Sequence, residues 1–397
     1  MGLIIINIIL ISVFGGFMLY LAGLSVMSLF TKKMKNFETT RFKRFAIVIP
    51  AHNEENSITP TIESLLKIDY PRDLFDIIVV ADNCTDRTYE IASKLGVTAL
   101  KRDDKTKRGK GYALRWCFDI ILGPSYNYEA IAIIDADTVV SSNYLRVINY
   151  YLENGSQTVQ VSDMVSPQPG AWSSEMTRLG FTLYNYVRPL GRKLFKGTAG
   201  IRGNGMCFRT QVLKKIPWNT YSLNEDLEYG IILFLNRVNV DFVPETTVFA
   251  TMPIQTKIAE TQRTRWEKGR FPVIKRYTIP LLAGTLKNMS FRYCDLFLEL
   301  LIPPFVNLFS GVLLICFIHL ILWIFNLQHA FTFFIIWVIV VLLGISHVFI
   351  GLISARADKN LYTALIQIPR YAVWKLFLYS KRFLKKSTSE WIRTERE

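Results

Sequence analysis

The stretch "IAIIDADTVV", Ile131 to Val140, places four apolar residues directly before two carboxylates, Asp135 and Asp137. An apolar run of this kind, bounded by polar residues, predicts a buried strand of a parallel sheet with both carboxylates at its C-terminal end. Open α/β sheets bind ligands at that edge. Two carboxylates this close repel each other, so a site that keeps both ionised usually holds a cation. We expect Mg²⁺ or Mn²⁺, which prefer oxygen ligands. The alternative is a turn in which the two side chains cap the next helix.

Residues 45 to 293 alternate apolar strand patterns with amphipathic helix patterns, which is the order of an α/β domain. The runs "FAIVIP" and "FDIIVVAD" end at His52-Asn53-Glu54 and at Asp82. Right-handed crossovers bring such strand ends into one crevice, together with the carboxylates of the opening stretch. The predicted fold class is therefore α/β with a mainly parallel sheet.

Three further groups of residues are candidates for that crevice. Asp82, at a strand end, can accept hydrogen bonds from a nucleobase or ribose, or it can cap the helix that follows. Lys110 lies in the loop "KRGKGYALRW", where cationic side chains and glycine precede a helix, as suits a diphosphate. Glu225 and Asp226, in "LNEDLEYG", precede an amphipathic helix, and capping that helix is their alternative role.

Three apolar stretches are long enough to span a membrane: residues 3–30, 297–325 and 331–354. The chain carries a net charge of +15, and its Lys and Arg residues all fall on one side of these spans. The positive-inside rule makes that side cytoplasmic. We therefore expect a multi-pass protein of the cell (inner) membrane, with a cytoplasmic central domain and with the N-terminus and the linker "NLQHA" outside.

The expected domain organisation follows from these spans. It comprises a transmembrane helix (1–30), a cytoplasmic catalytic domain (31–294) with an interfacial segment near 268–292, two transmembrane helices (295–355) and a basic interfacial tail (356–397). Within the tail, residues 361–379 either form a fourth span or lie in the interface, and Pro369, Arg370 and Lys375 favour the interface. Basic residues mixed with aromatic ones beside the spans indicate contact with anionic lipid rather than nucleic acid.

The order of the motifs resembles that of a known family. A strand-end Asp82, the Asp-x-Asp at Asp135, the Glu-Asp at Glu225 and the "QRTRW" stretch from Gln262 to Trp266 lie between membrane spans. This chain thus resembles the family 2 glycosyltransferases of the cellulose, chitin and hyaluronan synthase type, over about residues 45–270. The resemblance implies a GT-A fold, a UDP-sugar donor and metal-dependent transfer.

Residue roles are carried over from that resemblance. It implies that Asp82 binds uridine, that Asp135 and Asp137 hold the Mg²⁺ or Mn²⁺ with Asp137 closer, and that Asp226 is the general base. Glu225 is the next candidate base. The donor-binding residues expected are His52, Glu54, Asp82, Lys110, Asp135 and Arg265. The acceptor-binding residues expected are Gln262, Arg265 and Trp266. Because one base suffices for direct displacement, we expect inversion at the sugar carbon.

Three functions remain open at this point. The first is polysaccharide synthesis, through a homo-oligomer or with other polysaccharide-synthesis proteins, because three spans are few for a sugar-conducting pore. The second is transfer of one sugar to a lipid, since ceramide glucosyltransferases share the motif order and have few spans. The third is a catalytically silent membrane scaffold, which predicts loss of the carboxylates that this chain retains.

Overall fold

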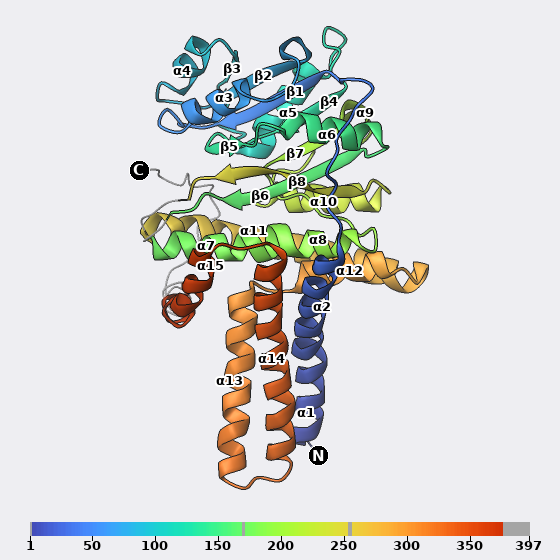
Figure 1. Cartoon of the computed structure of the whole chain (residues 1–397), viewed down its shortest axis with the longest axis vertical. Helices are drawn as coiled ribbons and strands as arrows, with labels where there is room; N and C mark the ends of the chain where they lie inside the picture. The colour runs from blue at the N-terminus through green and yellow to red at the C-terminus, as the bar shows by residue number, and fades with distance from the viewer. Residues whose placement is uncertain (1, 169–170, 253–255, 376–397) are drawn as a thin grey trace. The chain divides into compact units, whose positions relative to one another are not determined.

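The computed structural model describes residues 2–168, 171–252 and 256–375, which fall into two compact units (Figure 1). We call the unit that contains Lys32–Gln168 and Thr198–Lys275 the sheet unit. The helical unit contains the described residues of Met1–Thr31, Pro169–Gly197 and Arg276–Ser387. The catalytic domain expected to run from 31 to 294 is thus interrupted by a segment that belongs with the apolar helices.

The sheet unit is built on one eight-stranded sheet with the order β3-β2-β1-β4-β7-β6-β8-β5. Its strands are β1 (Phe45–Ala51), β2 (Phe75–Asp82), β3 (Thr98–Arg102), β4 (Ala130–Ile133), β5 (Thr138–Val140), β6 (Thr158–Val165), β7 (Met206–Arg209) and β8 (Val240–Ala250). Strand β1 pairs in parallel with β2 and β4, β2 with β3, and β6 with β8. Strand β7 runs antiparallel to β4 and β6, and β5 runs antiparallel to β8. The prediction of an α/β fold with a mainly parallel sheet is confirmed.

Helices connect the strands of this sheet (Figure 1). They are α3 (Ile58–Leu66), the 3-10 turn η2 (Arg72–Leu74), α4 (Thr88–Lys94), α5 (Lys110–Ile121), α6 (Tyr144–Glu153), α9 (Thr210–Lys215) and α10 (Glu225–Leu235). The long helix α11 (Thr256–Asn288) begins in the sheet unit and ends in the helical unit.

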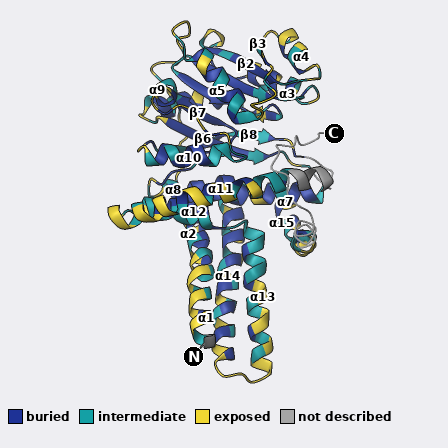
Figure 2. Cartoon of the chain, turned by 180° about the vertical axis from the view of Figure 1, so that it is seen from behind, coloured by how far each residue is buried: buried dark blue, intermediate teal, exposed yellow. Residues whose placement is uncertain are grey.

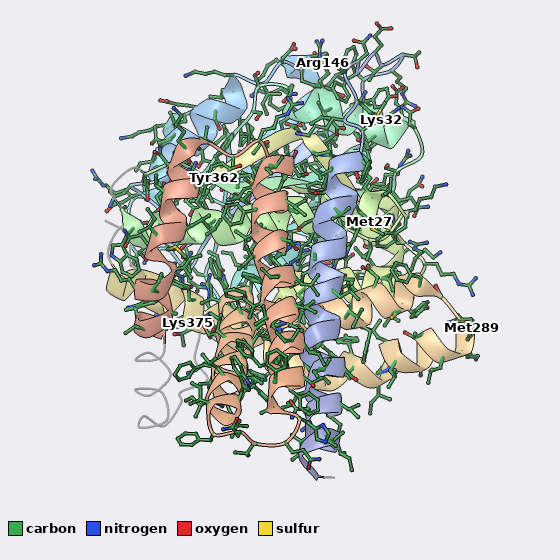
Figure 3. The ribbon with its side chains drawn as sticks, turned by 60° about the horizontal axis from the view of Figure 1, so that its bottom comes forward. Met27, Lys32, Arg146, Met289, Tyr362 and Lys375 are labelled. Carbon is green, nitrogen blue, oxygen red and sulfur yellow. The ribbon has the colours of Figure 1, made fainter. Side chains whose placement is uncertain are left out.

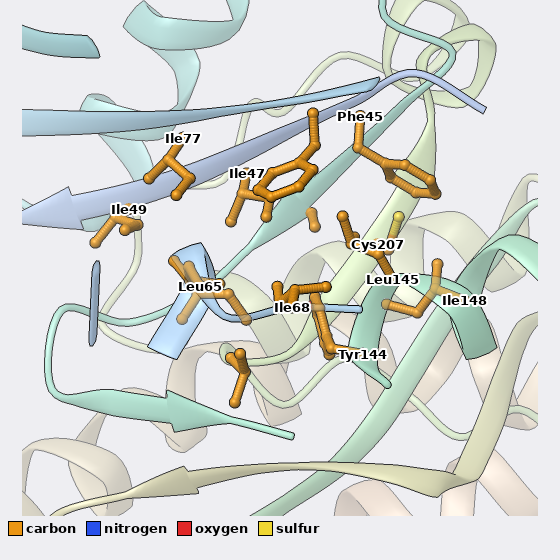
Figure 4. Packing of buried hydrophobic residues seen from close by; sticks show 14 of the residues in the cluster. Phe45, Ile47, Ile49, Leu65, Ile68, Ile77, Tyr144, Leu145, Ile148 and Cys207 are labelled. Carbon is orange, nitrogen blue, oxygen red and sulfur yellow. The ribbon is translucent and has the colours of Figure 1, made fainter. Parts of the chain in front are cut away.

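The core of the sheet unit explains why β1 is apolar almost throughout. Parallel strands covered on both faces read as continuous apolar runs, and Phe45, Ile47 and Ile49 are fully buried. Figure 4 shows β1 side chains together with Leu65 of α3 and Tyr144 of α6, which belong to the same buried cluster. Each such side chain contributes about 1.5–3 kcal/mol on burial. This packing holds the ends of β1, β2 and β4 in place.

The helical unit contains all three helices that are long and apolar enough to cross a membrane among the described residues: Ile4–Phe30, Phe305–Ile324 and Ala330–Ser354. The first comprises α1 (Gly2–Leu10), the π-helical turn η1 (Ile11–Gly15) and α2 (Gly16–Phe30), and the others are α13 (Phe305–Ile324) and α14 (Ala330–Ser354). Figure 2 shows exposed residues along these helices, as a lipid-facing surface requires.

Shorter helices complete the helical unit. They are α7 (Trp172–Phe181), the π-helical turn η3 (Thr182–Val187), α8 (Arg188–Lys193), α12 (Phe291–Leu301), α15 (Lys359–Ala364) and the 3-10 turn η4 (Leu365–Gln367). Met289, at the turn between α11 and α12, is 88% exposed and is labelled in Figure 3. Part of the segment 361–379 lies outside the described residues, and the described part is not among the three candidate spans.

The second span begins later than the expected residue 297. Helix α12 ends at Leu301, Ile302 is extended, and α13 starts at Phe305. Pro303 and Pro304 cause this break, because proline has no backbone N–H and disfavours a helical residue before it.

A buried ion cluster joins α8 to α2 and α12 within the helical unit. The Arg192 guanidinium lies 3.0 Å from Asp295 Oδ1 and 2.6 Å from Glu299 Oε2. The Tyr20 hydroxyl donates to Asp295 Oδ1 at 2.6 Å. Removing one partner of a buried pair of this kind typically costs about 3–5 kcal/mol. The inserted segment is thus firmly attached to the apolar helices.

Candidate active site

The parallel strands β1, β2 and β4 end at one edge of the sheet, where the first predicted site residues lie. His52 follows β1, and its Nδ1 is 2.7 Å from the carbonyl oxygen of Asp82, the last residue of β2. Asp135 follows β4 by two residues. The structure therefore brings the ends of β1 and β2 into direct contact, as the pattern of apolar runs predicted.

Asp82 is paired with a residue that the sequence did not point to. The guanidinium of Arg102, the last residue of β3, donates to Asp82 Oδ1, to the Lys107 carbonyl at 2.9 Å and to Asp104 at 3.2 Å. Burial raises the pKa of Asp82, and Arg102 opposes that rise. Asp82 does not cap the following helix, because the Thr88 amide donates to Asp86 instead. The paired carboxylate is held at the strand end.

Glu54 makes contacts that begin helix α3. Its carbonyl oxygen accepts from the Ser57 and Ile58 amides at 3.0 and 2.9 Å, and its Oε2 accepts from the Ser57 hydroxyl at 2.5 Å. These contacts give Glu54 a local structural role beside β1, whether or not it also contacts a donor.

Lys110 connects the basic loop to the Asp-x-Asp. Gly109 adopts a φ of 116°, open mainly to glycine, and α5 starts at the next residue. The Lys110 ammonium forms an ion pair with Asp135 and donates to the Gly203 carbonyl at 2.5 Å. Burial acts to lower the pKa of Lys110, but the charges of Asp135, Glu225 and Asp226 together outweigh it and the pKa is raised. Lys110 is therefore a fixed cation beside the predicted metal ligands.

Asp135 and Asp137 suit a divalent metal only in company with other oxygens. Among the described residues, no three His, Cys, Asp or Glu side chains are grouped so that they could hold an ion. Burial, and then the nearby charge of Asp135, raise the pKa of Asp163, at the end of β6, well above its ordinary value. The available donors are hard carboxylate oxygens, which fit Mg²⁺ or Mn²⁺. These ions commonly take one or two carboxylates and complete their shell with phosphate and water.

A glycine-rich loop, residues 200–205, closes one side of this group. Gly200, Gly203 and Gly205 all have positive φ, at 71°, 84° and 68°. Asn204 is 3% exposed, and its side chain hydrogen-bonds the Asp135 amide and the side chains of Thr138 and Asp163. The glycine run was the only sequence signal for this loop.

Glu225 and Asp226 are the first residues of α10 and lie against that loop. A Cβ on Gly203 would be 2.9 Å from Asp226 Oδ2. Burial and the charge of Asp226 raise the pKa of Glu225 from 4.5 to about 8. Burial also raises the pKa of Asp226, against the attraction of Lys110 and Arg202. When one of two neighbouring carboxyl groups holds a proton near neutral pH, the other is ionised and can act as a general base.

The "QRTRW" residues lie on the first part of α11. Arg265 is near enough for its charge to oppose the rise in the pKa of Glu225. The Asn224 side chain donates to the Trp266 carbonyl at 3.1 Å, and a Cβ on Gly269 would be 2.6 Å from Asn224 Oδ1. Gln262 is half-buried on the same helix. The structure thus brings α11 against the start of α10 in the sheet unit.

Comparison with known proteins identifies the family. Residues 43–269 match the family described as "Glycosyltransferase like family 2", and this span is more than half of the 397 residues. The chain belongs to glycosyltransferase family 2. The family 2 resemblance is thereby confirmed, and the protein is an enzyme, a hexosyltransferase of this family.

Relatives in the family differ in their products. The probable glycosyltransferase YdaM of Bacillus subtilis is 24% identical over 376 residues, which cover 89% of this chain and 87% of that protein. The β-monoglucosyldiacylglycerol synthase of Nostoc is 26% identical, covering 57% of this chain and 48% of that enzyme. The poly-β-1,6-N-acetyl-D-glucosamine synthase of Staphylococcus epidermidis is 24% identical, covering 60% and 57%. This family 2 enzyme is therefore similar both to a glycolipid synthase and to a polysaccharide synthase.

A solved structure confirms the GT-A fold. The mannosyltransferase PcManGT of Pyrobaculum calidifontis, in complex with GDP-mannose and Mn²⁺, superposes with a TM-score of 0.52. The two share 14% identity over 89% of this chain and 99% of that one, so the likeness concerns the fold alone.

Proposed function

We propose that this family 2 enzyme moves a sugar from a UDP-sugar to a growing polysaccharide or glycan at the inner face of the cell membrane, with inversion, in exopolysaccharide synthesis. One observation carries this proposal. The start of α10, with Glu225 and Asp226, lies beside the Lys110–Asp135 pair, since Lys110 acts on both carboxylates of α10. A candidate base therefore adjoins a candidate diphosphate site.

Each group of residues in the site would have its own role in binding the donor, the metal or the acceptor. Asp82 and His52 would hold the uridine at the ends of β2 and β1. Lys110 and Arg265 would offset the negative charge that builds on the departing UDP. A divalent cation bound at Asp135 and Asp137 would supply further electrostatic stabilisation of that charge. Gln262 and Trp266 would bind the acceptor, for which the flat indole ring suits the apolar face of a sugar.

Asp226 would take the proton from the attacking acceptor hydroxyl. A useful base has a pKa near the working pH, and the half-buried Glu225–Asp226 pair meets that requirement better than a fully exposed carboxylate would. Glu225 would hold the shared proton when Asp226 is ionised. Because the hydroxyl attacks as UDP leaves, one displacement inverts the sugar carbon.

Transfer of one sugar to a lipid is the second candidate, and the packing of the helical unit favours it. Buried apolar side chains, among them Met18, Leu308 and Trp337, fill the space between α2, α13 and α14. These apolar side chains do not offer the polar lining that a hydrophilic polymer would need to cross one bundle. The polysaccharide function would therefore require a homo-oligomer or other polysaccharide-synthesis proteins for export.

One experiment tests the activity and separates the acceptors. Membranes with the wild-type enzyme, incubated with a panel of radiolabelled UDP-sugars, should release UDP and incorporate sugar, and organic extraction then separates lipid product from polymer. Asp226→Asn keeps the shape of the side chain and should retain UDP-sugar binding but lose about 10²–10⁴ in rate. Glu228→Gln, on the same helix and hydrogen-bonded to Ser222, is the matched control and should keep transfer. If Asp226→Asn incorporated sugar at the wild-type rate, Asp226 would not be the base and Glu225 would become the candidate.

A further inference from the structure

Asn204 connects the glycine-rich loop to both carboxylates of the Asp-x-Asp. Its Oδ1 accepts from the Asp135 amide at 3.1 Å, which fixes the backbone that carries the Asp135 side chain. Its Nδ2 donates to Thr138 Oγ1 at 3.0 Å. The Thr138 hydroxyl in turn donates to Asp137 Oδ1 at 3.4 Å. One amide side chain thus reaches Asp135 directly and Asp137 through one intermediate.

The same side chain also reaches a third carboxylate. Asn204 Nδ2 donates to Asp163 Oδ1 at 3.1 Å, so its two donors serve Thr138 and Asp163 while its acceptor serves Asp135. An amide can do this because it carries a donor and an acceptor on one rigid plane. An Asp at this position would lack the donors, and a Leu of similar size would lack both.

The position of Asn204 is itself tightly held. Gln160, fully buried on β6, donates to the Asn204 carbonyl at 2.7 Å and accepts from the Arg202 amide at 3.0 Å. The Gly205 amide donates to the Ile133 carbonyl at 3.0 Å, which ties the loop to the end of β4. The left-handed backbone of Gly203 and Gly205, on either side, lets the loop turn this amide toward β4.

We propose that Asn204 is a positioning residue for the metal site, orienting Asp135 through its amide and Asp137 through Thr138. The inference rests on the proposed function, in which these carboxylates hold a divalent cation. Groups that hydrogen-bond a metal ligand orient it, and their loss typically lowers metal affinity by about 10–100-fold. Asn204 and Thr138 act on the carboxylates and do not themselves touch the ion or the donor.

The test measures Mn²⁺ binding rather than turnover. Purified enzyme is titrated with Mn²⁺ in the presence of UDP, and free Mn²⁺ is followed by electron paramagnetic resonance. The midpoint temperature of thermal unfolding, called the thermal midpoint below, is measured in parallel. Asn204→Ala and the nearly isosteric Thr138→Val should each weaken Mn²⁺ binding by about tenfold or more. Thr138→Ser keeps the hydroxyl and should bind Mn²⁺ as the wild type does.

Asn149 supplies the matched control. It is fully buried in the same unit and makes hydrogen bonds to the Lys43 amide, the Tyr70 hydroxyl and the Arg41 carbonyl. Asn149→Ala should lower the thermal midpoint as Asn204→Ala does, yet leave Mn²⁺ affinity unchanged.

Two results would overturn the inference, and they differ from each other. Wild-type Mn²⁺ affinity in folded Asn204→Ala and Thr138→Val, with only the thermal midpoint lowered, would make Asn204 purely structural and leave the proposed function standing. Failure of the wild-type protein to bind Mn²⁺ with UDP would remove the metal from the proposed function, and the positioning role with it.

Discussion

Glu225 and Asp226 are adjacent, half-buried carboxylates at the start of α10. Burial favours the neutral form of each, and ionisation of one makes ionisation of the other harder. Such a pair loses its protons in two coupled steps that belong to both residues. The raised pKa of Glu225, about 8, therefore means that the pair carries a proton at neutral pH. This pair of carboxylates stabilises the folded state less as pH rises, yet the enzyme retains it.

The effect on stability has a definite sign. A carboxyl whose pKa is raised on folding, here from 4.5 to about 8 for Glu225, adds stability below pH 4.5 that is lost as pH rises through 8. Glu225→Gln cannot ionise, so its thermal midpoint should equal that of the wild type near pH 4 and exceed it near pH 9. Glu90→Gln, at an exposed position of α4, should shift the midpoint equally at both values. A pH-independent difference for Glu225→Gln would show that burial does not disfavour its charge.

At the scale of elements, the strands were predictable and the loops that complete the site were not. Continuous apolar runs predicted β1 and β2, because buried parallel strands leave no room for polar side chains. The pairing of Asp82 with Arg102 arises instead from the neighbourhood of β2 and β3 in the sheet, across twenty residues of sequence. Asn204 likewise acquires its partners only when β4, β6 and β7 come together. Such contacts carry no local pattern.

The glycine-rich loop offers a test of its own, because two of its glycines differ in one respect. Gly200 and Gly203 both have positive φ, but an added Cβ meets nothing within 4 Å at Gly200 and Asp226 Oδ2 at 2.9 Å at Gly203. An L-residue in this backbone costs about 1–2 kcal/mol. Gly200→Ala and Gly203→Ala should therefore lose similar stability. Only Gly203→Ala should displace the Asp226 carboxylate and lower the transfer rate strongly. Equal transfer rates in Gly200→Ala and Gly203→Ala would show that the loop does not position the Asp226 carboxylate.

At the scale of the whole molecule, the three apolar helices were predictable and the composition of the helical unit was not. Long uncharged runs identify candidate spans directly. The segment Pro169–Gly197 has polar and charged residues throughout its helices, so it reads as part of an ordinary α/β domain. Its contacts within the helical unit include the pairing of Arg192 with Asp295 and Glu299 of α12, about a hundred residues away in sequence. Pattern alone does not reveal such a pairing.

The topology proposed for the three spans can be measured in intact cells. The positive-inside rule puts the N-terminus and the loop between α13 and α14 outside in this proposal, and Lys33 and Lys359 in the cytoplasm. A cysteine introduced at Gln328 should react with a membrane-impermeant maleimide in intact cells, whereas Lys33→Cys and Lys359→Cys should react only after permeabilisation. The five native cysteines set the background, which the unmodified chain measures. Labelling of Lys33→Cys and Lys359→Cys from opposite faces would require an odd number of spans between them, instead of the two predicted. The number of membrane crossings would then differ from three. The basic residues would no longer all face the cytoplasm.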